Sequence, residues 1–562
     1  MHQPSLEKRF SVFYDYEIFP LLRPPEMEDA SLDKPVAIVG AGPVGMVLAL
    51  LLAKQGIAST LIESKAQVSN GSRAVALTRR SVEILQQAGA EKPFVANGFG
   101  WNSGVSFFRG ERVFEMKLPQ DPDDRFPPIL NNSQQCWGEC LVDACARDPL
   151  IDLRWQTKLI RITDGEGGVA LGLDTPDGPY DLRANWAVAC DGGRSAVRKE
   201  MGLRMVGTAC DGKFVITDFR APDLDLPVQR YCYFDSPWNS GTNVLVHRQP
   251  NDIWRFDYRL PDDESREYAL APVTIATRTR RIMEMIGQVV EWEPDWATIC
   301  SPNALTLPDF RRGHVLFSGD AAHMLPIFGI RGTNTGFQDA ENLAWKLAAV
   351  VKGEGTLALL DSYSSERVRA AHEICDEADK STRLMDPPTR GYRVMSEAIL
   401  QFALTEPFTR EMLHWRTSRP HEYTRSPLNA AGDDDAAFAG GSAHGVVGRN
   451  LRLGDDDFLF DHFAFGPQLL VFNPEGAALD VSDLAGRHGL RVLAFGSRVS
   501  AATEELSVSD AILARFGLTG PETHTCCGRT CMSRGAGRAL IPAGLPPRST
   551  PPARTSERSG TC

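Results

Sequence analysis

The stretch that most constrains this chain lies near its beginning, where a short apolar run meets closely spaced glycines and then a longer apolar run. Val36–Val39 predicts a strand, Gly40–Gly45 a tight turn, and Met46–Ala53 a helix. In a G-x-G-x-x-G turn the first glycine permits the bend, the second lets the backbone approach a phosphate, and the third lets helix and strand pack closely. The stretch therefore predicts a strand–turn–helix unit whose helix N-terminus faces a phosphate-bearing ligand.

A carboxylate at the end of the next apolar run supports this interpretation. Ile57–Ile62 predicts a second strand, and it ends at Glu63, eighteen residues after Gly45, where a carboxylate can accept hydrogen bonds from a ribose. Arg73 follows in a loop of small residues, where a cation can face a phosphate, although this position fits a surface arginine equally well. The predicted dinucleotide site, which the stretch alone does not assign to NAD or FAD, contains Gly40, Gly42, Pro43, Gly45 and Glu63.

A membrane-spanning helix is the alternative interpretation of the same stretch. Pro35–Ala53 carries no charge and is nearly long enough to cross a bilayer. Its glycines, the internal Pro43 and the acid at the expected distance oppose that interpretation. The dinucleotide site is therefore preferred, both over a membrane span and over a βαβ unit without a ligand.

The size and charge of the chain limit its class. Its 562 residues exceed what one hydrophobic core serves, so two or three domains are expected. A formal net charge of −12 lacks the basic field that nucleic acids require, so no nucleic-acid partner is expected. No signal-peptide apolar segment follows Met1, and we expect a cytoplasmic protein without membrane association. The twelve cysteines show no metal-site spacing, so we predict buried free thiols and no metal.

Two further apolar runs end at residues that suit close approach to a ligand. Trp186–Cys190 predicts a buried strand that leads into Asp191-Gly192, although such a pair is also common in ordinary turns. Val315–Ser318 predicts another strand, which leads into Gly319-Asp320. A long helix then begins at about Asn334, and its N-terminus points into a glycine loop. Residues 101–130 and 214–304 show short, aromatic-rich strands and predict an inserted, substrate-facing antiparallel sheet.

Together, the glycine turn with Glu63, the Asp191-Gly192 pair and the run from Gly319 to His323 resemble the motifs of group A flavoprotein monooxygenases, the FAD-dependent aromatic hydroxylases. The similarity covers most of residues 35–380 and is greatest to the branch of 3-(3-hydroxyphenyl)propionate hydroxylase and phenol hydroxylases. The resemblance implies an α/β fold: a Rossmann-like FAD-binding domain with an inserted antiparallel-sheet substrate domain, followed by a C-terminal thioredoxin-like α/β domain.

The resemblance also implies how FAD is held, with Glu63 on the adenosine ribose, Gly42 near the pyrophosphate and Asp320 on the ribityl chain. Arg73 and Gln135 match family positions that touch the ribityl or phosphate region. The other implied cofactor-binding positions are Gly40, Pro43, Gly45, Asp191, Gly192, Gly319, Gly332, Asn334 and Thr335.

The activity implied by the resemblance is hydroxylation of a phenolic substrate similar to 3-(3-hydroxyphenyl)propionate. NADH or NADPH would dock transiently and reduce the flavin, which would react with O₂ to give a C4a-hydroperoxide that a phenolic ring attacks ortho or para to its hydroxyl. The helix N-terminus near Asn334 and Thr335 would favour the anionic reduced flavin. The alternatives are a hydroxylase of a polycyclic phenol, a flavin NAD(P)H oxidase, and a flavin-binding protein without turnover.

The glycine loop departs from the family pattern at one position. Relatives often carry Pro-Pro-x-x-Gly-Gln-Gly, whereas Pro326–Gly332 places Arg331 where glutamine is common. No residue is assigned firmly to catalysis, and the candidates are Arg331 and Pro326. Arg331 could stabilise reduced flavin, pair with a substrate carboxylate or form a salt bridge to a surface acid. His323 is expected to brace the loop rather than to act as a base.

The predicted domain boundaries follow from these patterns. Residues 1–34 form an N-terminal arm, 35–385 the FAD-binding monooxygenase domain, 386–440 a helical bridge and 441–522 the thioredoxin-like domain. The last of these lacks a C-x-x-C pair, and its expected role is packing or formation of a homodimer.

The final segment, 523–562, has an abrupt change of composition and predicts an aberrant, disordered tail. It contains four of the twelve cysteines, six arginines and one acidic residue. When the segment is back-translated with GC-rich codons and read in a neighbouring frame, the product resembles the terminal strands of the thioredoxin-like domain. We therefore interpret the segment as the product of a one-base frameshift before Thr523 that removes the last strand pair of that domain.

Overall fold

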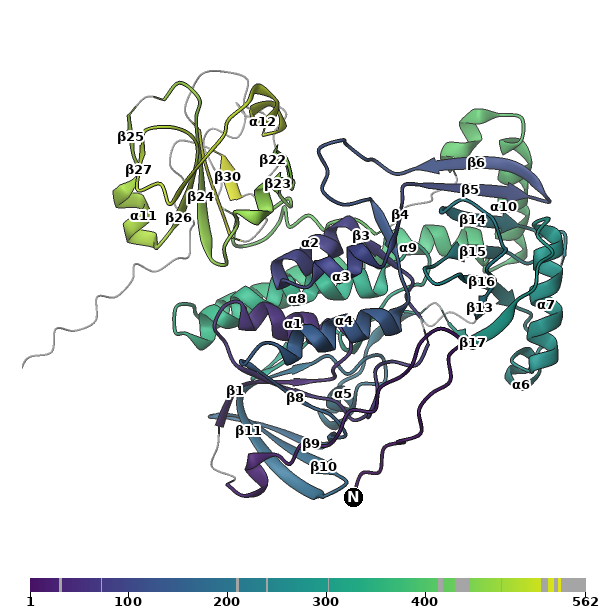
Figure 1. Ribbon diagram of the computed structural model, residues 1–562, viewed down its shortest axis with the longest axis horizontal. Helices are drawn as coiled ribbons and strands as arrows, with labels where there is room; N and C mark the ends of the chain where they lie inside the picture. The colour runs from purple at the N-terminus through teal and green to yellow at the C-terminus, as the bar shows by residue number, and fades with distance from the viewer. Residues whose placement is uncertain are drawn as a thin grey trace, which may run out of the picture. The chain divides into compact units, whose positions relative to one another are not determined.

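The computed structural model describes residues 1–29, 33–71, 73–208, 212–238, 241–301, 303–412, 418–429, 445–476, 478–516, 524–529 and 534–536. The chain divides into two compact units (Figure 1). The first contains Met1–Val351 and Leu357–His421, and the second contains Lys352–Thr356 and the chain from Glu422 onward.

The first unit is built on a sheet whose central strands are parallel. The strand order is β19-β20-β11-β1-β2-β8, and β10 and β9 continue antiparallel from β11. Val36, Ala37 and Ile38 of β1 are fully buried, as expected for a strand covered on both faces. The strands are β1 (Asp33–Val39), β2 (Ser59–Ile62), β8 (Ile151–Arg154), β9 (Lys158–Gly165), β10 (Gly168–Thr175), β11 (Gly178–Ala189), β19 (Arg311–Arg312) and β20 (Val315–Phe317).

Helix α1 (Pro43–Ala53) packs between α8 (Gly332–Val351) and α4 (Gln134–Ala146) (Figure 1). Its residues from Gly45 to Ala53 are all buried, which explains why the run is apolar on every side. Among the residues that the structure describes, no helix combines the length and hydropathy needed to cross a bilayer. Helices α2 (Arg79–Ala88), α3 (Glu91–Ala96) and α9 (Leu357–Met385) accompany them, whereas α5 (Ala196–Glu200) packs on β9.

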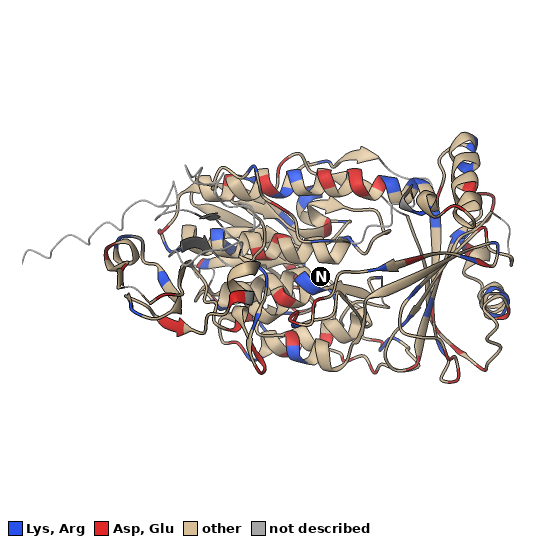
Figure 2. Cartoon of the chain, turned by 90° about the horizontal axis from the view of Figure 1, so that it is seen from above, with Lys and Arg blue, Asp and Glu red and all other residues tan. Residues whose placement is uncertain are grey.

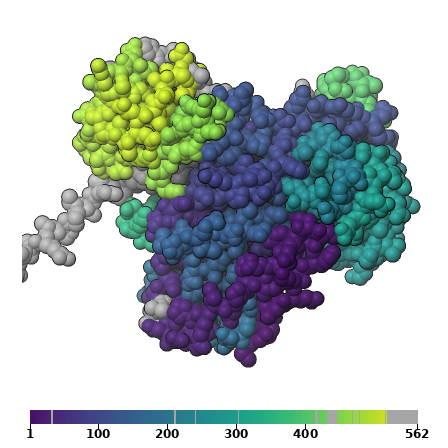
Figure 3. Space-filling view, in the orientation of Figure 1, coloured from purple at the N-terminus to yellow at the C-terminus, as the bar shows by residue number. Residues whose placement is uncertain are grey.

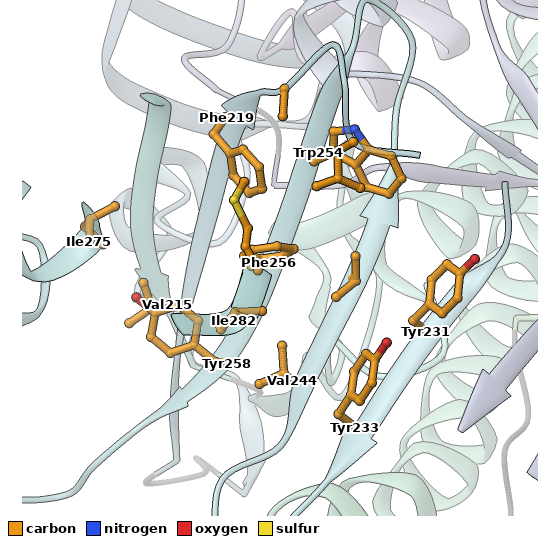
Figure 4. Close-up of a cluster of buried hydrophobic side chains, with 14 of the residues drawn as sticks. Val215, Phe219, Tyr231, Tyr233, Val244, Trp254, Phe256, Tyr258, Ile275 and Ile282 are labelled. Atoms are coloured by element: carbon orange, nitrogen blue, oxygen red, sulfur yellow. The ribbon is translucent and has the colours of Figure 1, made fainter. Parts of the chain in front are cut away.

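A second, mostly antiparallel sheet is inserted into this unit, with the order β17-β13-β16-β15-β14-β5-β6. One face packs under α7 (Pro272–Met285), where alternate strand residues such as Phe219, Trp254 and Phe256 form an apolar cluster (Figure 4). The opposite face carries the intervening residues, which include a second apolar cluster with Phe214 and Leu245 and buried polar side chains such as Arg255. The strands are β5 (Ser103–Phe108), β6 (Glu111–Lys117), β13 (Lys213–Arg220), β14 (Arg230–Phe234), β15 (Val244–Arg248), β16 (Ile253–Leu260) and β17 (Glu293–Cys300).

Smaller elements complete the first unit. Two small sheets have the orders β3-β7-β4 and β12-β18-β21, and they contact α2, α8 and α9. The N-terminal residues, dark purple in Figure 3, lie on the surface of the unit, where Ser11 donates to Asp295 of β17 and Phe19 stacks on Trp155. The elements are η1 (Pro25–Met27), β3 (Ala76–Thr78), β4 (Phe99–Trp101), β7 (Ile129–Asn131), β12 (Val206–Thr208), α6 (Arg266–Ala269), β18 (Ala304–Thr306), η2 (Gly319–Ala321), β21 (His323–Met324), α10 (Arg390–Ala403) and η3 (Pro407–Met412).

The second unit has a five-stranded sheet with the order β28-β26-β24-β29-β30. Strand β24 is parallel to β26 and antiparallel to β29, an arrangement that agrees with the predicted thioredoxin-like domain. The elements are β22 (Arg452–Gly454), β23 (Asp457–Phe458), η5 (Leu459–Asp461), β24 (Pro467–Asn473), β25 (Leu479–Asp480), α11 (Ser482–His488), β26 (Arg491–Gly496), β27 (Val499–Ser500), β28 (Glu504–Leu506), α12 (Asp510–Arg515), β29 (His524–Arg529) and β30 (Arg534–Ala536).

Two strands of this sheet correct the prediction for the final segment. Strands β29 and β30 both lie after residue 523, and β29 pairs with β24 along six residues, from Pro467–Arg529 to Phe472–His524. These residues therefore supply a terminal strand pair that we expected to be missing, because the exposed edge of β24 offers backbone partners to any extended segment. Residues 537–562 lie outside the described part of the chain, and so do residues 413–417 and 430–440 of the predicted bridge. The helices α10 and η3, which fall within the predicted bridge, belong to the first unit.

Acidic and basic side chains are interspersed along the described helices and strands (Figure 2). Within that part of the chain, no group of three or more His, Cys, Asp or Glu side chains is arranged to hold a metal ion.

Candidate functional site

Four of the predicted ligand-binding segments meet at one edge of the parallel sheet. Strands β20, β11, β1 and β2 are neighbours and parallel, so their carboxyl ends lie together. These ends lead into Gly319-Asp320, Cys190-Asp191, Gly40 and Glu63 respectively. Open α/β sheets bind ligands outside this edge, so the topology brings the separate motifs into one site.

The three glycines of the first turn have different surroundings. A Cβ on Gly40, which has a φ of +106°, would lie 2.5 Å from the carbonyl oxygen of Cys190. A Cβ on Gly45 would lie 2.1 Å from the carbonyl oxygen of Gly40. Gly42 has an ordinary extended backbone, with φ −74° and ψ 173°, and a Cβ there would meet nothing within 4 Å. Gly40 and Gly45 are therefore required by internal packing, whereas Gly42 borders the open space that a pyrophosphate would fill.

The carboxylate of Glu63 is held beside this turn. One oxygen accepts a hydrogen bond from the backbone N–H of Ala41 at 3.1 Å, and the other accepts from the N–H of Lys65 at 3.0 Å. A carboxylate offers about four lone-pair directions, so acceptor capacity remains for a ribose hydroxyl.

Asp320 lies in the short helix η2, directly after β20. Its side chain is exposed, yet the protein surrounds it so closely that burial raises the pKa of its carboxyl group. The charges of His323 and Arg73 oppose this rise, so Arg73 lies within electrostatic range of Asp320. The backbone N–H of Arg73 donates to Gln134 Oε1 at 3.1 Å, which brings the start of α4 to the same place.

Three buried polar atoms at predicted cofactor positions have no hydrogen-bond partner in the described structure. They are Gln135 Oε1, Asp191 Oδ1 and Thr335 Oγ1. The other oxygen of Asp191 accepts from the N–H of Val197 at 3.1 Å, and burial raises the pKa of this carboxyl group. Buried polar atoms in native proteins are almost always paired, so a bound ligand is the natural partner for atoms at this edge. The residues present thus fit an extended dinucleotide.

The side chain of Asn334, in contrast, is fully used by the protein. Its Oδ1 accepts from the N–H of Thr78 at 2.8 Å and from Ser81 Oγ at 2.6 Å. Its Nδ2 donates to the carbonyls of Ala76 at 3.0 Å and Ile330 at 2.7 Å. Asn334 therefore fixes the first turn of α8 against β3 and α2, and its contribution to a cofactor would come from its backbone N–H. The N–H of Thr335 donates to the carbonyl of Arg331 at 2.8 Å, whereas the N–H groups of Gly332, Thr333 and Asn334 come too early in α8 to have a partner within the helix.

A buried ion cluster fixes the loop that carries Asp320. Asp339 of α8 accepts from the N–H of Gly319 at 3.0 Å, pairs with His323 Nε2 at 2.6 Å and pairs with Arg367 Nε at 2.6 Å. His323 thus contacts the loop as a brace, in line with the sequence prediction. Asp339 and Arg367 were not predicted from the sequence. Each is a charged residue on the buried face of its helix, which marks it as unusual but does not identify its partner.

The two catalytic candidates lie within the glycine loop. Pro326 is buried, and Arg331 is 4% exposed with its Nε donating to the carbonyl of Phe328 at 3.2 Å. Burial raises the pKa of Cys375 on α9 to about 11, and the charge of Arg331 opposes that rise, so the guanidinium lies near α9. These contacts assign Arg331 to the support of the loop, and its role in catalysis stays a prediction.

Comparisons with known proteins agree with this geometry. The family model described as "FAD binding domain" matches residues 33–378. A 3-(3-hydroxy-phenyl)propionate/3-hydroxycinnamic acid hydroxylase of Mycolicibacterium smegmatis is 30% identical over 379 residues, which cover 66% of this chain and 65% of that relative. The protein of the same name from Escherichia coli is 26% identical over 365 residues, which cover 65% of this chain and 64% of that relative.

Solved structures show the same fold. A p-nitrophenol 4-monooxygenase from Pseudomonas putida is 26% identical, with a TM-score of 0.58, over 69% of this chain and 99% of that one. An aklavinone-11 hydroxylase in complex with FAD and aklavinone is 23% identical, with a TM-score of 0.71, over 91% of this chain and 97% of that one. The fold predicted from the sequence, α/β with an FAD-binding domain, is confirmed.

Proposed function

Because the chain belongs to the family of FAD binding domain proteins, we propose that it is an FAD-dependent monooxygenase that hydroxylates a phenolic ring, with NADH or NADPH as the reductant and O₂ as the oxidant. The observation that carries this proposal is the edge of the parallel sheet, where Gly42, with open space beside its backbone, Glu63 and Asp320 follow neighbouring strands. Bound FAD would supply the redox chemistry that passes electrons from the nicotinamide to O₂ and delivers one oxygen atom to the ring.

The residues of this chain have defined tasks in that proposal. Gly42 and the start of α1 receive the pyrophosphate, while Glu63 accepts hydrogen bonds from the ribose. Asp320 and Arg73, which lie within electrostatic range of each other, would hold the middle of the cofactor. The N-terminus of α8 stabilises negative charge on the flavin ring through its unpaired N–H groups and its partial positive charge.

The substrate that the relatives support best is a phenol with a short acidic side chain. The relatives of Mycolicibacterium smegmatis and Escherichia coli are named as hydroxylases of 3-(3-hydroxyphenyl)propionate and 3-hydroxycinnamic acid. A second candidate is a small phenol without that side chain, since the p-nitrophenol 4-monooxygenase matches over nearly its whole length.

Oxygen uptake by the FAD-loaded protein tests the proposal. NADH and NADPH are each supplied with and without members of a phenol panel, and products and hydrogen peroxide are quantified. Uptake that a phenol stimulates, together with a hydroxylated product, supports the monooxygenase. Uptake that yields only peroxide with every phenol would instead assign an oxidase, and FAD binding without any uptake would assign a flavin-binding protein.

A further inference from the structure

A row of polar side chains crosses the second sheet on the face opposite to α7. Asp218 of β13 lies opposite Arg255 of β16, and Arg255 lies opposite His247 of β15. Arg255 and Asp218 form a two-pronged ion pair with both N–O distances at 2.7 Å, so these two charges satisfy each other. Burial lowers the pKa of His247, and the charge of the nearby Arg230 on β14 lowers it further.

Two members of this polar face have atoms that remain unsatisfied. Asp257 follows two positions after Arg255 on β16, and its Oδ1 has no partner within the described structure. His247 Nδ1 is likewise buried without a partner. The two side chains approach to 3.7 Å between Asp257 Oδ2 and His247 Nε2, which is too far for a hydrogen bond. Unsatisfied atoms on adjacent central strands indicate that this face receives a polar ligand.

The cofactor loops border this face of the sheet. Arg255 Nη1 donates to the carbonyl of Arg73 at 3.4 Å, and the charge of Arg73 acts on both Cys300 of β17 and Asp320. Phe328 of the glycine loop packs edge-to-face on Phe214 of β13, with ring centroids 5.1 Å apart. Asp257 is therefore in the region between the cofactor loops and the sheet, and its side chain is still 15% exposed there.

We propose that Asp257 is the base of the hydroxylation, accepting the hydrogen bond and then the proton of the phenolic hydroxyl of the substrate. This assignment rests on the proposed function. The O–H bond of the phenol breaks, the proton moves to the Asp257 carboxylate, and the electron pair stays on oxygen, which makes the ring more nucleophilic. When the ring has gained one oxygen atom of O₂, the proton released by the ring carbon leaves with the second oxygen atom in the water that forms, and the proton on Asp257 returns to the original phenolic oxygen. The step itself changes no oxidation state.

The electrostatics of the site suit a base that works near neutral pH. Burial raises the pKa of Asp257 to about 7, the charges of Arg255 and Arg230 oppose the rise, and Asp218 adds to it. A catalytic pKa near the working pH is the favourable choice for proton transfer. The charged and titratable groups around Asp257 are Arg255 on its own strand, Asp218 on β13, His247 on β15, Arg230 on β14 and Cys300 on β17.

The test uses the FAD-loaded protein and a phenol that the wild type hydroxylates. The variants are Asp257→Asn, Asp257→Glu and the control Asp252→Asn, which lies on the same β15–β16 hairpin and is 43% exposed. For the wild type, kcat/KM is expected to rise with pH through about 7 and then level off. Asp257→Asn should lower kcat/KM by roughly 10²–10⁴-fold and abolish the rise, while Asp257→Glu keeps it and Asp252→Asn changes nothing.

Two further readouts separate a base from a structural carboxylate. In Asp257→Asn, FAD content and the rate of flavin reduction should stay at the wild-type level while the yield of hydrogen peroxide per NAD(P)H increases. The ratio of wild-type to Asp257→Asn kcat/KM should also be smaller for a ring-fluorinated analogue of the same phenol. The hydroxyl of this analogue is more acidic, so removal of its proton depends less on a base.

If Asp257→Asn hydroxylates a phenol with the same kinetics as the wild type, the assignment of Asp257 as the base is wrong and the proposed function stands. If no phenol stimulates the wild type, the proposed function fails and the assignment fails with it. If Asp257→Asn does not fold, the dependence of the wild-type kcat/KM on pH tests the assignment instead. A kcat/KM that stays constant between about pH 6 and 8 would exclude a base whose pKa is about 7.

Discussion

Replacement of Gly42 by valine separates ligand binding from folding at the first turn. The backbone of Gly42 already has φ −74° and ψ 173°, which any residue adopts, and a Cβ there meets nothing within 4 Å. Gly42 is the N-cap of α1, so valine loses a small capping preference, and it gains about 0.4–1 kcal/mol because the unfolded chain has less freedom. The free energy of unfolding of the FAD-free protein should therefore change by less than about 1 kcal/mol.

The effect on FAD should be much larger. The valine side chain fills the space assigned to the pyrophosphate, so the N–H groups at the start of α1 no longer reach its oxygens. A hydrogen bond to a charged group contributes about 1.5–3 kcal/mol, and the loss of two therefore weakens FAD binding by roughly 10²–10⁴-fold.

Gly45→Ala is the matched control for this prediction. Its Cβ would lie 2.1 Å from the carbonyl oxygen of Gly40, so the turn itself must move and stability should fall together with FAD affinity. The assay is thermal unfolding of the FAD-free proteins combined with titration of FAD by fluorescence quenching. Wild-type FAD affinity in Gly42→Val, or a stability loss as large as that of Gly45→Ala, would refute the reasoning.

Three variants and one sequencing experiment test other features of the chain. Asn334→Ala should destabilise the FAD-free protein by about 1–3 kcal/mol, measured by denaturant unfolding, because four buried hydrogen bonds lose their partner. Arg331→Gln should lower the melting temperature and leave the rate of flavin reduction nearly unchanged, whereas a changed rate with normal stability would return Arg331 to catalysis. Burial alone would lower the pKa of His462, but its hydrogen bonds to Asp457 and Glu504 raise the pKa above the usual value. The protonated imidazole therefore stabilises the second unit below about pH 6.5, the usual pKa of histidine. This stabilisation is lost as the pH rises through the pKa of His462 in the folded protein. Hydrogen exchange in β28 should therefore speed up with pH more in the wild type than in His462→Asn, after correction for intrinsic exchange. Finally, sequencing of the gene tests the frameshift hypothesis for the segment after residue 523, which codons incompatible with the neighbouring frame would exclude.

The meeting of the predicted motifs at one edge of the parallel sheet was largely predictable because each motif is local. Each of Gly40, Glu63, Asp191 and Asp320 follows a short apolar run, and parallel strands in a βαβ arrangement place such ends together. The backbone geometry at Gly42 likewise follows from the spacing of the glycines. Here local sequence and global topology specify the same site.

The surroundings of the polar row on the second sheet could not be predicted from local sequence. The alternation of Trp254, Arg255, Phe256 and Asp257 predicts a strand with one apolar and one polar face, and a polar face normally meets water. In the structure this face lies against the cofactor loops, so Arg255 is 1% exposed. Periodicity identifies the two faces of a strand but not what covers them.

Long-range partners account for the other differences. Asp339 and Arg367 lie on two helices and share a buried ion pair with His323, and no local pattern joins the three. The prediction for the final segment failed for the same reason. Its composition predicts disorder, whereas in the structure β24 provides backbone partners for β29. In both cases the deciding interaction comes from a residue distant in sequence.

The origin of the oxygen atom in the product tests the central claim most directly. The FAD-loaded protein is supplied with NADH or NADPH, a phenol that stimulates oxygen uptake, and ¹⁸O₂ in unlabelled water, and the product is analysed by mass spectrometry. We predict a hydroxylated phenol that carries one ¹⁸O atom for each NAD(P)H consumed in coupled turnover. A product without the label, or consumption of O₂ that appears entirely as hydrogen peroxide, would contradict the assignment of a monooxygenase.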